Sequence, residues 1–141
     1  MPTRLQNTPK WSAVSPKIPI SWGELIDKIT ILEIKSERIR GKAALGNVRK
    51  QLSLLHAIAH TVFGNTSAFA KLRRQLRVIN ERLWDIEDHI RRKEAAGEFD
   101  AEFIELARSI YKNNDDRGAK KREIDLKLGS ALVEEKSYQH Y

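Results

Sequence analysis

Four polar residues stand where the helical periodicity of the sequence predicts buried positions. Glu33 falls on the main apolar face of one predicted helix, and three polar residues share the apolar stripe of another: Asn114, Arg117 and Lys121. Because an isolated charge is very costly to bury, we expect the acid and the cations to meet at the centre of the fold. One interpretation is a salt-bridge network, Glu33 with Arg117 or Lys121, that fixes the register of the helices.

The alternative interpretation is a polar ligand pocket. Two cations against one acid leave a surplus positive charge, which a phosphate, a carboxylate or a sugar phosphate would satisfy. Trp84, or secondarily Trp22, would supply a wall for a ring. A polar stripe beside Trp84 adds three secondary candidates: Asn80, Glu87 and Arg91. If Glu33, Arg117 and Lys121 lined one accessible cavity, they could also stabilise a reaction electrostatically, which keeps a small enzyme as a second hypothesis.

No recognised catalytic arrangement is present in the sequence. It contains no phosphate loop, no dinucleotide fingerprint and no cysteine. His56 and His60 are four residues apart, a spacing that suits a metal ion, but no carboxylate lies near them in the sequence. We therefore expect solvated histidines, no metal and no cofactor.

The composition is that of a basic, helix-rich protein. The 141 residues carry a net charge of +7, but the cations are spread along the chain, which favours a solvated basic surface over a nucleic-acid interface. Nucleic-acid binding is thus a third, weaker hypothesis. The N-terminus lacks the apolar segment of a secretory signal, and no apolar run approaches the ~20 residues of a membrane span. We expect a soluble cytoplasmic protein.

The pattern predicts an all-α antiparallel bundle of about four helices. All four prolines lie within the first nineteen residues, which favours long uninterrupted helices downstream. We expect an extended or disordered basic arm, in which Trp11 is the one large aromatic that could dock on the body, then one helical domain and a short tail: residues 1–19, 20–138 and 139–141. The expected helices are 22–44, 48–63, 68–96 and about 101–136, with the two long ones paired antiparallel.

Local signals support these boundaries. Ser21 and Glu24 form a capping box, and Asn47 and Asp100 are N-cap residues for later helices. Residues 113–118 are poor helix formers, so a break there is an alternative, but the apolar phase continues across them and favours one helix. At ~1.5 Å per residue this helix is about 50 Å long, more than the second helix can cover. A homodimer is therefore expected.

Several long motifs resemble a small bacterial family classed as a domain of unknown function. The opening motif is ISWGELIDKITILEIK with the two residues before it, and the later blocks are LWDIED, IYKNNDDR and EEKSY. Together the blocks span about residues 18–138. The resemblance implies a bacterial protein and an association with glycosyltransferases and surface-polysaccharide genes, and it supplies no catalytic residue. With the pocket, it predicts a helical binding or accessory protein for a small anionic or sugar-phosphate ligand, or for a partner enzyme in glycan assembly.

Overall fold

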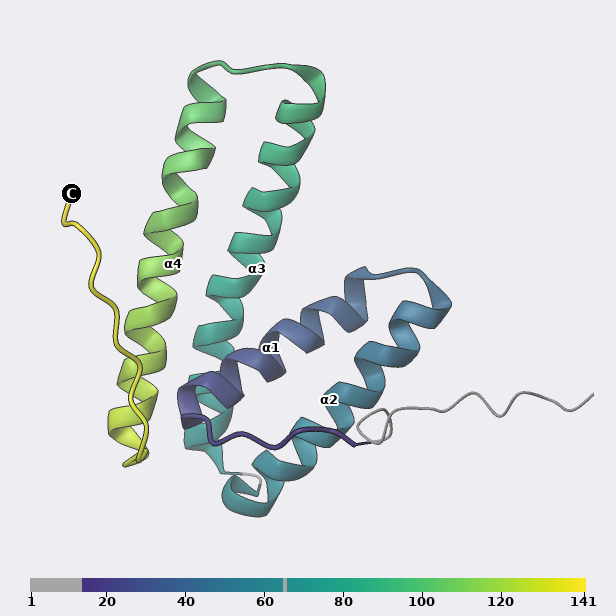
Figure 1. The fold of residues 1–141 in the computed structure, drawn as a ribbon, viewed down its shortest axis with the longest axis vertical. Helices are drawn as coiled ribbons and strands as arrows, with labels where there is room; N and C mark the ends of the chain where they lie inside the picture. The colour runs from purple at the N-terminus through teal and green to yellow at the C-terminus, as the bar shows by residue number, and fades with distance from the viewer. Residues whose placement is uncertain (1–13, 65) are drawn as a thin grey trace, which may run out of the picture.

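The computed structural model describes residues 14–64 and 66–141, and within them the fold is all-α, with four packed helices and no strand (Figure 1). The predicted fold class is confirmed. No helix in this part of the chain is long and apolar enough to cross a membrane. The helices are α1 (Trp22–Arg38), α2 (Lys42–Phe63), α3 (Ser67–Ala96) and α4 (Ala101–Lys127).

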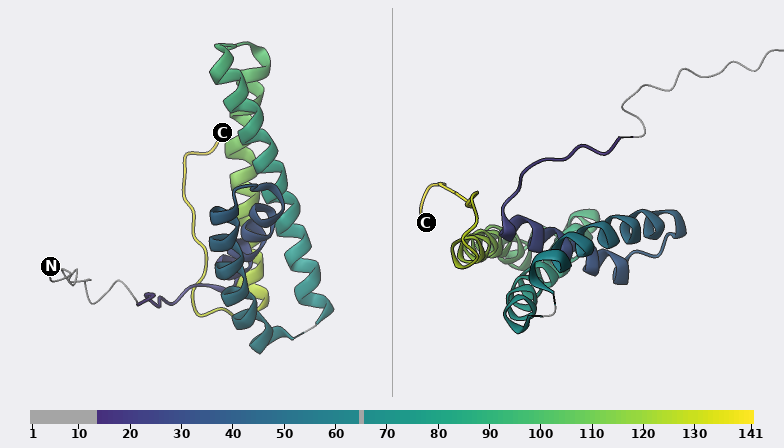
Figure 2. Two further views of the ribbon diagram at one scale, coloured as in Figure 1. Left: turned by 90° about the vertical axis from the view of Figure 1, so that its right-hand side faces the viewer. Right: turned by 90° about the horizontal axis from the view of Figure 1, so that it is seen from below.

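Helix α1 is the central element, because it packs against each of the other three helices. Helices α3 and α4 form a long antiparallel hairpin, and α1 lies between this hairpin and α2 (Figure 2). Ile26 of α1 packs with Leu76 and Ile124 of the hairpin, while Ile29 packs with Ala59 of α2. A helix that is apolar nearly all round must be surrounded in this way.

The connection between the first two helices differs from the prediction. Helix α1 ends at Arg38 rather than at residue 44, and α2 begins after Gly41 rather than after Asn47. Gly46, expected near the end of the first helix, lies inside α2. The early turn at residues 39–41 brings Ala59 back against α1, and this burial of apolar surface outweighs continuation of the first helix through those residues.

Helix α4 runs without a break through residues 113–118, as the apolar phase predicts. It ends at Lys127, however, and not at residue 136. Gly129 adopts a left-handed conformation with φ of 61°, and the Ser130 N–H donates to the carbonyl of Asp125 five residues back. This is a glycine-based helix stop. The remaining chain returns along α4, where the Tyr141 hydroxyl donates to Asp115.

The predictions for the helix N-caps and for the N-terminal arm are tested only in part. The Ser21 hydroxyl accepts from the Glu24 N–H at 3.1 Å, as in a capping box, and Asp100 caps α4 through the Phe103 N–H. Residues 14–20 form neither helix nor strand. Trp11 lies outside the described residues.

Candidate functional site

A groove opens where α1, α3 and α4 meet, near the C-terminal half of α1. Its volume is about 430 Å³, and its lining mixes apolar side chains with a few polar ones. Six of the predicted site residues line it, three of them leading candidates (Trp84, Asn114 and Arg117) and three secondary (Asn80, Glu87 and Arg91). Ile31, Ile34, Leu83 and Asp88 complete the wall. The structure thus brings together polar stripes that lie far apart in the sequence.

Arg117 is the groove residue best placed to bind a ligand, because its guanidinium donors are unpaired among the described residues. It is half-buried on α4, and none of the hydrogen bonds or ion pairs found among residues 14–64 and 66–141 involves its guanidinium. Its charge lowers the pKa of the buried Asp27, although burial has the larger, opposite effect on that carboxyl. A guanidinium has five N–H donors. When it is half-buried and these donors are unpaired, binding of an anion from solution is favoured.

A buried polar chain supports the wall behind Arg117. The Asn80 side-chain amide donates to Asp27 Oδ1 at 2.8 Å and to Thr30 Oγ1 at 2.9 Å. The Thr30 hydroxyl donates in turn to the Asp27 carbonyl oxygen at 2.9 Å. Burial raises the pKa of the Asp27 carboxyl, since water no longer stabilises its ionised form. The chain holds Asn80 in place and ties α3 to the second turn of α1.

The remaining charges of the groove lie on one cation and two acids of α3. Arg91 donates to Glu87 at 3.1 Å, a pair one helical turn apart, and Asp88 stands beside them. The Trp84 ring is held at the rim by Arg38, whose guanidinium carbon lies 5.8 Å from the ring centroid. The lining therefore contains two guanidinium and two carboxylate groups around an aromatic wall.

Lys121 does not contribute its charge to the groove. Its ammonium pairs with Glu24 at 2.6 Å and with Glu134 at 3.4 Å. Burial is the largest single effect and lowers the pKa of Lys121, but the hydrogen bond to Glu24 and the charges of Glu24, Asp27 and Glu134 together outweigh it and leave the pKa raised. The cation is fully engaged in joining α1, α4 and the chain after α4.

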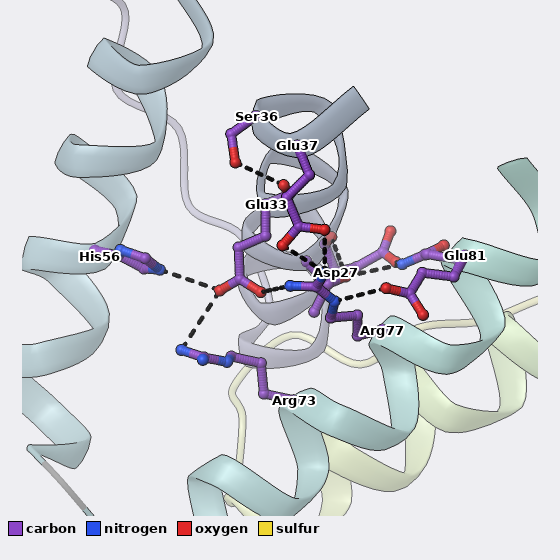
Figure 3. Close-up of polar contacts among 10 residues, drawn as sticks. Asp27, Glu33, Ser36, Glu37, His56, Arg73, Arg77 and Glu81 are labelled. Atoms are coloured by element: carbon purple, nitrogen blue, oxygen red, sulfur yellow. Dashed lines mark hydrogen bonds and ion pairs between the residues drawn. The ribbon is translucent and has the colours of Figure 1, made fainter. Parts of the chain in front are cut away.

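Glu33 also lies elsewhere, in an ion cluster between α1, α2 and α3 (Figure 3). Its carboxylate accepts from Arg77 at 3.2 Å and pairs with Arg73 at 3.4 Å, and His56 lies 3.3 Å away. Arg77 also binds Glu37 and Glu81. The expected pairing of Glu33 with Arg117 or Lys121 is thus not formed.

The helical geometry explains this separation. Ile34 lines the groove, and the neighbouring Glu33 projects about 100° away around α1, towards α2 and the start of α3. Glu33 does meet cations, but they are Arg73 and Arg77 near the start of α3 rather than Arg117 or Lys121. Trp22 likewise lies outside the groove, against Phe63 at 5.1 Å between ring centroids.

Sequence reasoning missed the junction that aligns α1 with α4. Asp125 is fully buried and accepts from the Gly23 N–H at 2.6 Å and from the Glu134 N–H at 2.8 Å. A carboxylate at the first turn of a helix satisfies unpaired donors and complements the helix dipole. A Cβ at Gly23 would lie against the Lys121 carbonyl oxygen, so only glycine allows this approach. The signal in the sequence was a glycine at the second position of a strongly predicted helix.

Comparison with known proteins gives a family and no activity. No curated protein and no solved structure matches the chain. The opening motif and later blocks predicted membership of a family classed as a domain of unknown function, and a family model now covers almost the same residues. It matches residues 16–141, and the chain therefore belongs to the family of unknown function DUF6165.

Proposed function

We propose that this protein is a binding or accessory protein whose groove takes a small sugar phosphate or a related anion. The observation that carries the proposal is the state of Arg117, which is half-buried in the groove and unpaired among the described residues. A guanidinium in such a position offers parallel N–H donors that match the oxygens of a phosphate. A concave site that combines an apolar wall with polar groups able to orient a ligand is typical of small-molecule binding.

The other side chains suit the sugar part of such a ligand. Trp84 presents a flat apolar surface at the rim, suited to the apolar face of a sugar ring. The carboxylates of Glu87 and Asp88 accept hydrogen bonds from hydroxyl groups, and the amide of Asn114 both donates and accepts. The groove thus combines a guanidinium that is unpaired among the described residues, for the phosphate, with several acceptors for hydroxyls.

The charge balance distinguishes this ligand from a simple anion. Glu87 and Asp88 would repel inorganic phosphate, and the Glu87 carboxylate already neutralises Arg91. A ligand that places its phosphate at Arg117 and its hydroxyls towards the carboxylates avoids that repulsion. A sugar phosphate also agrees with the association with glycan assembly that the resemblance implies.

Isothermal titration calorimetry with glucose 1-phosphate tests the proposal, with glucose and inorganic phosphate as comparison ligands. We expect glucose 1-phosphate to bind more tightly than either fragment. Arg117→Ala should weaken its binding about 10–100-fold, because a charge-assisted hydrogen bond contributes about 1.5–3 kcal/mol. The helical circular dichroism of the variant should stay as in the wild type.

A matched variant controls for the loss of charge alone. Arg92→Ala removes an exposed guanidinium of α3 that does not line the groove, and we expect it to leave binding unchanged. Equal loss of binding in both variants would indicate a general electrostatic effect. Unchanged binding in Arg117→Ala would contradict the proposal, and collapse of its helical signal would favour a purely structural role for Arg117.

The enzyme hypothesis has less support. It required Glu33, Arg117 and Lys121 in one cavity, and only Arg117 lines the groove. Nucleic-acid binding through the start of α3 is also weaker, because Arg73 and Arg77 are engaged with Glu33. Binding to nucleic acid that fell steeply with salt concentration would restore that hypothesis.

A further inference from the structure

The outer face of α2 carries apolar side chains that no other element covers within residues 14–64 and 66–141. Leu54, Ile58 and Val62 follow each other at four-residue spacing, and each is at least half exposed. The opposite face of α2, with Val48 and Ala59, is the one that is buried. The helix contains three cations and no acid, the cations being Lys42, Arg49 and Lys50. The outer face of α2 is therefore an apolar stripe on a positively charged helix.

The tip of the α3–α4 hairpin, residues 94–107, has the opposite charge. It contains five acids, and four of them pair with Lys93 or Arg108 at its two ends. The five acids and these two cations leave residues 93–108 with a net charge of −3. Two large apolar side chains are exposed there, Phe99 at 61% and Ile104 at 56%. Helix α1 ends at Arg38, which pairs with Asp85, so it does not reach the tip. Among the described residues the tip is covered by no other helix.

The two surfaces cannot meet within one molecule. The tip lies at the far end of the hairpin, while α2 lies beside the other half, next to α1 (Figure 1). The half of the hairpin that carries the tip extends beyond the shorter α1–α2 pair (Figure 1). Exposed apolar patches of this kind mark interaction surfaces, and their opposite charges match each other.

We propose that these surfaces bind each other between two copies of the chain, so that α2 of each copy packs against residues 94–107 of the other. A two-fold axis makes this contact twice and closes the dimer. Contact between two α2 helices would bring two surfaces of net positive charge together, and contact between two tips would bring two surfaces of net negative charge together. Both pairings are opposed by like-charge repulsion, which leaves the crossed pairing.

Charge reversal on each surface tests this arrangement by sedimentation velocity at low ionic strength. One variant carries Arg49→Glu and Lys50→Glu on α2, and the other carries Glu94→Lys and Glu105→Lys at the tip. We expect the wild type to sediment as a species of twice the 16.2 kDa of one chain. Each variant alone should be monomeric, because both of its contacts now join like charges.

The mixture of the two variants gives the decisive result. In a mixed dimer the reversed α2 faces the reversed tip, and the two unchanged surfaces face each other, so both contacts are again complementary. We expect the equimolar mixture to recover the wild-type dimer. Lys127→Glu, an exposed reversal outside both surfaces, should dimerise normally. Circular dichroism checks that each variant keeps its helices.

Four results would overturn the proposal. The first is a wild type that stays monomeric at every concentration tested. The second is a dimer that persists in the tip variant alone, which would indicate contact through α2 or another surface. The third is a mixture that remains monomeric, which would show that the two surfaces do not face each other. Species larger than a dimer would contradict the two-fold arrangement.

Discussion

The contact between Gly23 and Asp125 allows the effect of packing on stability to be distinguished from the effect of helix propensity. In Gly23→Ala, the new Cβ would lie 2.8 Å from Asp125 Oδ1 and closer still to the Lys121 carbonyl oxygen. The latter belongs to the backbone of α4 and cannot move as a side chain would. To make room, α1 must shift away from α4, which lengthens the 2.6 Å hydrogen bond from the Gly23 N–H.

Two contributions set the size of the effect. Overpacking of a tight contact costs about 1–3 kcal/mol, and weakening a hydrogen bond to a buried carboxylate costs about 1.5–3 kcal/mol. We therefore expect Gly23→Ala to lower the free energy of unfolding by about 3–5 kcal/mol. For a chain of this length the melting temperature should fall by on the order of 10 °C.

Gly46→Ala is the matched control, because it makes the same chemical change inside α2. A Cβ at Gly46 meets no atom within 4 Å, and alanine favours a helix over glycine by about 0.5–1 kcal/mol. Urea unfolding followed by circular dichroism should therefore show opposite signs for the two substitutions. A stabilised Gly23→Ala variant would refute the account of the α1–α4 junction.

Three further substitutions test other polar contacts, each by urea unfolding. Asp125→Ala removes the acceptor of two backbone N–H groups and should cost about 3–5 kcal/mol, against less than about 0.5 kcal/mol for the exposed Asp116→Ala on the same helix. Because the pKa of Asp27 is raised in the folded protein, the favourable contribution of this carboxyl to stability is complete below its ordinary pKa of 3.8. That contribution is lost as the pH rises. The stability of Asp27→Asn relative to the wild type should therefore increase from about pH 3 to about pH 7. A difference in the free energy of unfolding that stays constant over this range would contradict the raised pKa of Asp27. Glu33→Gln should cost only about 1 kcal/mol, because Arg77 keeps its other carboxylate partners, and a loss several times larger would show that the cluster depends on Glu33.

The sequence was sufficient to predict the architecture because long apolar periodicities dominate it. The 3,4 spacing along α3 places Leu72, Leu76 and Leu83 in the core, where the structure has them buried. The unbroken phase across residues 113–118 correctly outweighed their poor helix propensity. The same phase placed Arg117 on the inner side of α4, so the groove residues share faces that periodicity alone identifies.

The partners of the buried charges could not be predicted in the same way. Periodicity gives the face of a residue but not its height along the bundle or the neighbour across it. Glu33 and Arg117 both point inward, yet they lie on different sides of α1. Lys121 finds Glu134 only because the chain turns back after Gly129, and that turn is a local effect of one left-handed glycine.

The contact of Gly23 with Asp125 could not be predicted from the sequence, for a related reason. A buried aspartate near a helix end and a glycine near a helix start are each common, and their pairing depends on how α1 crosses α4. That crossing also fixes the groove, since it sets how far Ile34 stands from Arg117. The site is thus a product of tertiary geometry built on faces that the sequence already shows.

The most direct test of the central claim is the ¹H–¹⁵N spectrum of the protein during a titration with glucose 1-phosphate. Trp84 lines the groove, whereas Trp22 packs in the core against Phe63. The indole N–H signals of these two residues therefore compare a groove position with a core position in the same spectrum. The proposed function predicts that the Trp84 indole and the Asn114 amide shift with the ligand while the Trp22 indole does not. A spectrum in which the groove signals stay unchanged would contradict it.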